Sequence, residues 1–241
     1  MDKLAVILCG GRGSRLGSIT DNMPKPLVEV RGKPILWYTV MNLYHQGFRK
    51  FIFPLGYKGE MIKEYIGNLV SKLDDYCFRG FIDTGENTSI ALRIAQIKPL
   101  IPHHSDFFLV NGDTLFDFDI DEMYEKHKKE GALVTLSSVE VVAPWGLIKT
   151  TANGTVVGFD RERKIRHVGS RFEAMGFVNS GLAWINKDAL GLIDLDDCGD
   201  FETDLYNKAI VNGRCSHYEI KGMWYPIDTQ KDLENINREM G

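Results

Sequence analysis

The sequence predicts an α/β fold with a Rossmann-like, mostly parallel central sheet flanked by helices. Two observations carry this prediction. Apolar, strand-like runs alternate with helical patterns through the first half of the chain, and a glycine-rich loop directly follows the first run. Strand–helix–strand order implies parallel pairing with right-handed crossovers. The second half has short strand-like runs joined by turns, which predicts a mixed, partly antiparallel continuation of the same sheet.

Strands and helices are expected where apolar residues follow the matching periodicity. In the first half, strands are expected at residues 4–8, 50–55, 79–82 and 106–110, and helices at 35–46, 60–69 and 89–101. Gly47 fits the end of the first helix, and Pro102 the end of the third. In the second half, strands are expected at 132–142, 146–150, 156–159 and 180–185, a turn at 152–154, and a helix at 205–211.

The composition is that of one globular unit. The chain has 241 residues, of which 44% are hydrophobic, and it contains no linker, repeat or low-complexity stretch. We therefore expect a single domain over residues 1–241. The net charge of −4 argues against a general nucleic-acid-binding protein, and the absence of any run of about 18 apolar residues argues against a membrane span. The four scattered cysteines lack zinc-binding spacing, which favours reduced thiols in a cytoplasmic protein.

A glycine-rich loop, Leu8-Cys9-Gly10-Gly11-Arg12-Gly13-Ser14-Arg15-Leu16, follows the first expected strand. Its glycines let the backbone approach a ligand closely and direct N–H groups at phosphate oxygens. A dinucleotide-binding loop would need a glycine in place of Leu16 and a continuous helix after it, which Pro24 and Pro26 interrupt. A Walker A loop would need Gly-Lys-Ser/Thr, which is absent.

Three cations, Arg12, Arg15 and Lys25, accompany this loop at one end of the expected strand. Positive side chains beside glycine N–H groups suit a triphosphate. A structural glycine turn is the alternative, and for Lys25 alone it is a solvated surface lysine. Cys9 is interpreted as a small apolar residue packed beside the loop, because no His or Asp motif around it would activate a nucleophile.

Several motifs together resemble the signature of the sugar-1-phosphate nucleotidyltransferases. They are Gly10-Gly11-x-Gly13-x-Arg15-Leu16, Pro24-Lys25-Pro26-Leu27-Val28, Gly32-Lys33-Pro34-Ile35-Leu36, Gly112-Asp113, Val178-Asn179-Ser180-Gly181 and Trp224-x-Pro226-x-Asp228-Thr229. The likeness covers nearly the whole chain. Within the family, the chain most resembles the glucose-1-phosphate cytidylyltransferases. The motifs for that branch are Lys33-Pro34-Ile35-Leu36-Trp37, Gly56-Tyr57-Lys58-Gly59 and Asp83-Thr84-Gly85.

The resemblance implies a GT-A-like nucleotidyltransferase fold, with residues 1–130 as the nucleotide-binding half and 131–241 as the sugar-phosphate-binding half. It implies transfer of a nucleoside monophosphate, CMP from CTP in that branch, to a sugar 1-phosphate with release of pyrophosphate. Arg15 and Lys25 match the family positions that hold the triphosphate, and are the expected catalytic residues. The expected nucleotide-binding residues are Leu8, Cys9, Gly10, Gly11, Arg12, Gly13, Ser14, Thr84, Gly85, Thr88 and Gly112.

Asp113 and Asp228 are the candidate metal ligands. Asp113 follows the apolar strand at 106–110, at the sheet edge where ligands of parallel sheets gather, and Asp228 follows a second apolar run. Two carboxylates at strand ends suit Mg²⁺, which prefers oxygen ligands and bridges substrate phosphates. By resemblance, these are the family's Mg²⁺ ligands. A turn-capping aspartate is the alternative for each.

The residues expected near the base and the sugar depart from the family pattern. Relatives usually continue the Asp-Thr-Gly motif with Gly-Gly-Arg, whereas this chain has Ala91-Leu92-Arg93; in the competing account Thr88 caps a helix and Arg93 is solvated. Relatives often carry Glu-Lys-Pro after a Gly-x-Val-x-x-Phe strand, where this chain has a charged stretch in which Arg163 or Lys164 could substitute. The expected sugar-phosphate-binding residues are Gly146, Arg163, Asn179, Ser180, Gly181 and Glu202.

The acceptor and the base stay open at this level. The acceptor could be a hexose, a heptose or another modified-sugar phosphate, or a non-sugar phosphate. Guanylyl, uridylyl or thymidylyl transfer, and a catalytically silent nucleotide-binding relative, are the alternatives to CMP transfer. The expected partners are small molecules, a nucleoside triphosphate and a sugar 1-phosphate, without nucleic acid or membrane, and a homo-oligomer is compatible with the sequence.

Overall fold

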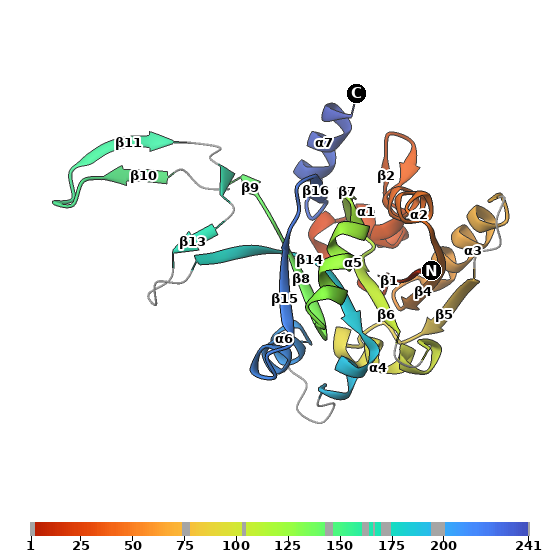
Figure 1. Cartoon of the computed structure of the whole chain (residues 1–241). Coiled ribbons are helices and arrows are strands. Elements are labelled where there is room, and N and C mark those ends of the chain that lie inside the picture. Colours follow the sequence, from red (N-terminus) through yellow and green to blue (C-terminus); the bar gives the residue numbers. More distant parts are fainter. Residues whose placement is uncertain are drawn as a thin grey trace.

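The computed structural model describes residues 3–73, 78–102, 105–142, 147–160, 164–165, 167–169, 175–193 and 201–240 (Figure 1). A mixed, mostly parallel sheet forms its centre, as the sequence predicts. Its main strands are, in spatial order, β15 (Cys215–Glu219), β8 (Val134–Val139), β14 (Met175–Asn186), β6 (Asp106–Asn111), β1 (Lys3–Leu8), β4 (Phe48–Leu55) and β5 (Phe78–Asp83). Only β14 runs antiparallel to its neighbours β6 and β8 among these strands.

Helices cover both faces of this sheet. One core cluster takes apolar side chains from α2 (Ile35–His45), α3 (Gly59–Val70) and α5 (Ile120–Lys129), and another takes them from α4 (Ile90–Ile97) and α6 (Phe201–Val211). Ala5 and Ile7 of β1 face the first cluster, whereas Leu4 and Val6 face the second. This alternation is expected for a strand buried on both sides. No helix in the described ranges is long and apolar enough to cross a bilayer.

Most of the expected elements of the first half are present, and the third helix is shorter than expected. The expectation placed it at 89–101, but α4 ends at Ile97 and a 3-10 turn, η3 (Lys98–Leu100), follows. Pro99 explains the early end, because it has no backbone N–H to donate and its ring clashes with the carbonyl four residues earlier. The expectation omitted α5, although Asp119 caps its N-terminus by accepting hydrogen bonds from two backbone N–H groups.

The second half continues the sheet and then leaves it. The run expected at 132–142 is two strands, because β8 pairs with β14 and β15 whereas β9 (Val141–Val142) pairs with β12 (Lys164–Ile165). The strand expected at 180–185 begins earlier, at Met175, and its register with β8 shifts between Asn179 and Ala183. Gly181 lies in this shift with φ at 77°, a bend that hides the strand's alternation in the sequence.

A hairpin of β10 (Leu147–Thr150) and β11 (Val156–Asp160) extends away from the body of the molecule (Figure 1). The expected turn joins its two strands, with Thr151 N donating to Thr155 O at 2.9 Å and Gly154 at φ 84°. Beside it, β13 (His167–Gly169) pairs with the first part of β14. The second half is therefore less compact than the first.

The C-terminal segment returns to the first half of the chain. Strand β16 (Met223–Pro226) pairs antiparallel with β7 (Thr114–Asp117), which follows β6 directly. Helix α7 (Gln230–Glu239) then packs its Ile236 into a third apolar cluster. That cluster contains Leu16 from the glycine loop and Ile227 from the segment before α7. The C-terminal segment therefore packs against the glycine loop that follows β1.

Candidate active site

The carboxyl ends of four parallel strands meet at one edge of the sheet. Strands β1, β4, β5 and β6 end there in the glycine loop, at Gly56, at Thr84 and at Gly112-Asp113. The backbone N–H of Gly112 donates to Leu8 O at 3.0 Å and joins two of these loops. A Cβ at Gly112 would lie 2.9 Å from Cys9 Sγ and 3.0 Å from Leu8 O, so this close approach requires glycine.

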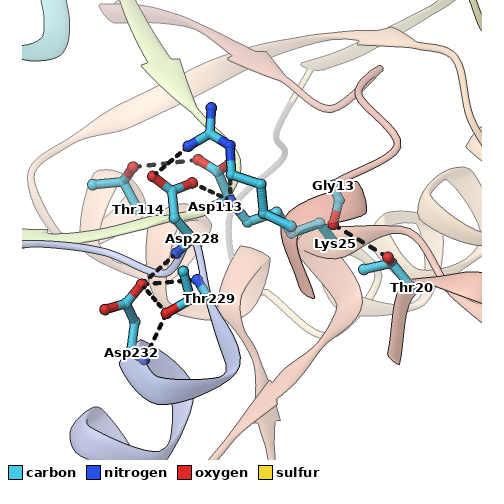
Figure 2. Close-up of polar contacts among 9 residues, drawn as sticks. Gly13, Thr20, Lys25, Asp113, Thr114, Asp228, Thr229 and Asp232 are labelled. Carbon is cyan, nitrogen blue, oxygen red and sulfur yellow. Dashed lines mark hydrogen bonds and ion pairs between the residues drawn. The ribbon is translucent and has the colours of Figure 1, made fainter. Parts of the chain in front are cut away.

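The glycine loop turns sharply toward Lys25. Gly13 has φ at 67°, and a Cβ on it would lie 2.6 Å from the Cβ of Lys25. A short 3-10 helix, η1 (Ser14–Leu16), follows and places Leu16 in the apolar interior. Thr20 Oγ1 donates to Gly13 O at 3.2 Å and fastens the loop to the next segment (Figure 2). Gly13 is therefore needed both for its backbone conformation and for the space that Lys25 occupies.

Lys25 is buried and bridges two carboxylates. It begins the 3-10 turn η2 (Lys25–Leu27), which Pro24 and Pro26 stiffen. Its side chain is 7% exposed, and its Nζ donates to Asp113 Oδ2 at 2.7 Å and to Asp228 Oδ1 at 2.8 Å (Figure 2). Burial of an ammonium is costly unless carboxylates pair with it. The solvated-lysine alternative for Lys25 is therefore wrong.

Arg15 pairs with Asp228 on the solvent-exposed side of the Lys25–Asp113–Asp228 cluster. Its Nη1 lies 3.0 Å from Asp228 Oδ2, and its side chain is 74% exposed. Its guanidinium is therefore accessible to a ligand. Asp228 itself does not cap α7: Thr229 is the N-cap, and Asp232 Oδ2 accepts from the backbone N–H groups of Asp228 and Thr229 (Figure 2). The capping alternative for Asp228 is therefore wrong, and its carboxylate faces the two cations.

Three adjoining pockets surround this group. The glycine-loop pocket is lined by Leu8, Cys9, Gly11, Gly13, Ser14, Arg15, Lys25, Pro26, Asp113 and Asp228. The α4 pocket is lined by Leu8, Gly10, Gly11, Glu86, Asn87, Thr88, Ile90, Arg93, Asn111 and Asp113. The β14 pocket is lined by Arg15, Asn111, Asp113, Thr114, Asn179, Ser180, Gly181, Glu202, Trp224, Pro226 and Asp228. Asp113 lines all three. Arg15 and Asp228 line the glycine-loop and β14 pockets, and Lys25 lines the glycine-loop pocket.

The β14 pocket carries polar groups suited to hydroxyls. Asn179 Nδ2 donates to Glu202 Oε2 at 3.2 Å, and Asn179 Oδ1 accepts from the N–H of Gly181 at 3.1 Å. Ser180 differs, because its buried hydroxyl bonds to Ser137 inside the sheet and its carbonyl accepts from Trp224 Nε1 at 3.0 Å. Gly146 and Arg163 lie outside the described residues, and Lys164 is placed in β12 by its backbone alone.

The α4 pocket contains some of the residues expected at the base. Thr88 lines it, but Ser89 is the N-cap of α4, accepting from the N–H of Leu92 at 3.3 Å. Arg93 is 4% exposed and hydrogen-bonded to backbone carbonyls. The account in which Thr88 caps the helix and Arg93 is solvated is therefore wrong. Thr84 is buried and donates from Oγ1 to Leu55 O, so its hydroxyl supports the loop from behind.

Other expected residues lie at the margin. Gly85 has φ at 87° and donates from its N–H to Asp83 Oδ1 at 3.0 Å. Arg12 packs over the ring of Tyr57, 5.1 Å from its centroid. Sequence reasoning missed Asn111, which lines two pockets, and Trp224, which lines one. Asn111 immediately precedes the Gly112-Asp113 motif, and Trp224 begins the Trp-x-Pro-x-Asp motif, so the sequence carried the signal.

The described cysteines carry no sign of reactivity. Cys9 is buried, and burial together with the Asp113 carboxylate raises the pKa of its thiol far above the usual range. Such a thiol stays protonated and packs as a small apolar group. Burial also raises the pKa of Cys215, and both thiols are free. Cys77 and Cys198 lie outside the described residues.

Comparison with known proteins identifies the family of this chain. Residues 4–241 match the family model described as nucleotidyl transferase. The chain is 30% identical to a probable glucose-1-phosphate cytidylyltransferase of Bacillus subtilis, over 97% of this chain and 94% of that protein. It is 28% identical to a D-glycero-alpha-D-manno-heptose 1-phosphate guanylyltransferase of Aneurinibacillus thermoaerophilus, over 98% and 97%.

A solved structure extends the likeness to three dimensions. The crystal structure of HddC from Yersinia pseudotuberculosis superposes with a TM-score of 0.70 at 26% identity, covering all of both chains. The family model, the relatives and this structure all span nearly the whole chain, including the glycine loop and the segment before α7. The chain therefore belongs to the nucleotidyl transferase family and is a sugar-1-phosphate nucleotidyltransferase.

Proposed function

We propose that this enzyme transfers CMP from CTP to a sugar 1-phosphate, releases pyrophosphate and uses Mg²⁺ held by Asp113 and Asp228. One observation carries the proposal: Arg15 and Lys25 form ion pairs with the two carboxylates, and one of these, Asp113, lines all three pockets. A nucleotide with its phosphates in the glycine-loop pocket and its base in the α4 pocket would place its α-phosphate beside this group. The sugar phosphate would enter from the β14 pocket.

The donor set fits Mg²⁺. Both carboxylates hydrogen-bond to one ammonium, so their oxygens are close enough to share one small ion. Mg²⁺ usually takes one or two carboxylates and completes its shell with water and substrate phosphates. When bound, the ion neutralises and orients phosphate oxygens.

The chain's own residues supply positioning and charge. An oxygen of the sugar phosphate forms a bond to the α-phosphorus, the bond from that phosphorus to the bridging oxygen breaks, and pyrophosphate leaves with the electron pair. The attacking oxygen is already anionic, so no general base is needed. Arg15 presents a planar fork to the leaving phosphates, and Lys25 places one positive charge beside the α-phosphate. Stabilisation of the spreading charge is the largest contribution that such a site makes.

The base assignment rests on the family branch. The relative named cytidylyltransferase is 30% identical over nearly the whole chain. The Asp83-Thr84-Gly85 motif, which resembles that branch, directly precedes residues 86–88, which line the α4 pocket. Guanylyl transfer is the second candidate, because Glu86 lines that pocket. A carboxylate accepts two hydrogen bonds side by side, which suits the adjacent N–H groups of guanine. The relative named heptose 1-phosphate guanylyltransferase is 28% identical over almost its full length.

Turnover with defined substrate pairs tests the proposal. The protein is incubated with Mg²⁺, one of CTP, GTP, UTP or dTTP, and one of glucose, mannose or heptose 1-phosphate, while pyrophosphate and the nucleotide sugar are measured. We expect CTP to be used at least about tenfold faster than the other nucleotides. Preference for GTP would replace the first candidate with the second. Tight nucleotide binding without product from any pair would favour a silent relative.

A further inference from the structure

A buried arginine connects two walls of the α4 pocket. Arg93 lies in the first half of α4, is 4% exposed and lines the pocket. Its Nη1 donates to Leu55 O at 2.9 Å and to the Thr84 hydroxyl. Its Nη2 donates to Gly10 O at 3.1 Å and to Glu86 O at 3.0 Å. These four acceptors are all neutral oxygens, and they belong to the glycine loop, the end of β4 and the 84–86 loop.

The Arg93 guanidinium leaves no room for side chains at two neighbouring glycines. A Cβ at Gly10 would fall on the Arg93 guanidinium, and a Cβ at Gly56 would lie 2.5 Å from Nη1 and 2.5 Å from Gly10 O. Gly10 is therefore explained by the arginine, independently of any phosphate. A guanidinium directs several N–H groups in one plane, which a lysine ammonium cannot reproduce. Truncating it would leave several buried carbonyls without a donor.

We infer that Arg93 is a positioning residue that fixes the base-binding wall of the α4 pocket relative to the glycine loop. The inference rests on the proposed function, in which a nucleobase enters this pocket. Residues 86–88 line one side of it and Gly10-Gly11 the other, and Arg93 holds a carbonyl on each side. The spacing of these two sides decides which base fits. Phosphate binding in the glycine-loop pocket uses Arg15 and Lys25 and does not need this spacing.

Two variants separate positioning from a general structural role. Arg93→Lys keeps a positive charge and loses the fork. Gly56→Ala keeps the Arg93 residue, but its new Cβ crowds Arg93 Nη1 and Gly10 O. Gly56 has no positive φ and does not line the α4 pocket, so the substitution acts on the pocket only through these two groups. Arg49→Lys is the matched control, because Arg49 Nη1 also donates to two backbone carbonyls, of Tyr44 and Phe48, outside the three pockets.

Calorimetry measures the Kd of each of the four nucleoside triphosphates, and of pyrophosphate alone, with Mg²⁺. For Arg93→Lys and Gly56→Ala we expect the affinity for the preferred triphosphate to fall at least about tenfold, with the other three affected less. The ratio of affinities between the preferred triphosphate and the other three should therefore become smaller in both variants. Pyrophosphate has no base, so its Kd should stay within about twofold of wild type. Arg49→Lys should bind all five compounds as wild type does.

The alternative outcomes are distinct. Equal losses for pyrophosphate and triphosphate, or no loss for either, would overturn the inference, since Arg93 would then have a purely structural role or none. If Arg93→Lys does not fold, Gly56→Ala decides by the same comparison. Failure of the wild type to bind any triphosphate would overturn the proposed function together with the inference. Normal wild-type turnover with unaltered variants would overturn the inference alone.

Discussion

The Lys25 ammonium lies 2.7 Å from Asp113 Oδ2, although 88 positions separate the two residues in the chain. It also reaches Asp228 Oδ1 at 2.8 Å. The cation proposed to bind the triphosphate and the candidate metal ligands therefore neutralise one another. Under the proposed function, substrate phosphates would compete with the carboxylates for Lys25, and a metal ion would compete with Lys25 for the carboxylates. Binding of the two should be mutually favourable, because each releases the partner that the other needs.

Replacement of Lys25 by methionine should remove a charge that the reaction requires. We expect Lys25→Met to lower turnover at least about a hundredfold, the usual loss for one phosphate-stabilising group. Lys63→Met is the control, because Lys63 is half exposed on α3 and pairs only loosely with Glu60, at 3.6 Å. Steady-state rates at saturating substrates, with circular dichroism to verify folding, provide the measurement. A folded variant with near-normal turnover would remove Lys25 from the mechanism.

The same variant tests the competition between ammonium and metal. In Lys25→Met the two carboxylates face each other without their shared cation, so they should repel and bind Mg²⁺ more readily. We expect Mg²⁺ to raise the Tm of Lys25→Met more than that of the wild type, because a ligand stabilises the state that it binds. Thermal unfolding over a series of Mg²⁺ concentrations, without nucleotide, measures this. An equal or smaller shift in the variant would argue against a shared site.

Asp113 and Asp228 should each be required for turnover. We expect Asp113→Asn and Asp228→Asn each to lower turnover at least about a hundredfold, because a neutral amide is a poor ligand for Mg²⁺. Asp117→Asn is the matched control, since Asp117 lies exposed on β7 near Asp113 in sequence but does not line the three pockets. Activity titrated with Mg²⁺ distinguishes a weakened metal site from misfolding. Unchanged Mg²⁺ dependence in both variants would exclude the metal role.

The sequence predicted the first half of this site better than the second. Leu8, Asp113 and the glycine loop could be placed because parallel strands end at one sheet edge, a rule that needs only the order of elements. Asp228 could not be placed in this way. Its position depends on the pairing of β16 with β7, a contact between distant segments that local periodicity does not encode. Only the family resemblance linked Asp228 to Asp113.

Arg93 shows why the remaining part was not foreseen. A charged residue in a short amphipathic helix is normally solvated, and α4 gives no local sign of an exception. The acceptors that make its burial tolerable come from Gly10, Leu55 and the 84–86 loop, which converge only in the folded chain. The bend at Gly181 has the same origin. Its Cβ would lie 2.8 Å from the Asn111 side chain, which belongs to the neighbouring strand.

The sugar side can be tested separately from the nucleotide. Glu202 and Asn179 are hydrogen-bonded at 3.2 Å in the β14 pocket, where they could exchange this bond for sugar hydroxyls. We expect Glu202→Gln to raise the KM for the sugar 1-phosphate about tenfold, the usual effect of one lost charged hydrogen bond, with the Kd of the nucleotide unchanged. Glu60→Gln on α3 is the exposed control. A larger change in nucleotide affinity than in the KM for the sugar 1-phosphate would show that Glu202 does not act in sugar binding.

A second buried charge cluster lies at the start of β6, away from the pockets. The side chain of Asp106 is 3% exposed and accepts from Lys128 Nζ at 2.9 Å, Tyr124 OH at 3.1 Å and Asn186 Nδ2 at 2.7 Å, with His127 Nε2 at 3.4 Å. Burial alone would raise the pKa of this carboxyl. The hydrogen bonds from Lys128 and Asn186, together with the nearby His127 ring, outweigh it and hold the pKa well below the usual range.

The lowered pKa of Asp106 makes a prediction about acid stability. Since the folded pKa lies below the unfolded value of about 3.9, the cluster stabilises the fold fully above that pH, and this stabilisation is lost as the pH falls below it. We expect Asp106→Asn to lower the free energy of unfolding at pH 7 and to flatten its decline as the pH falls below about 4. Denaturant unfolding at several pH values measures both effects, with Asp117→Asn as control. A decline as steep in Asp106→Asn as in the wild type would assign the acid sensitivity to other carboxyl groups.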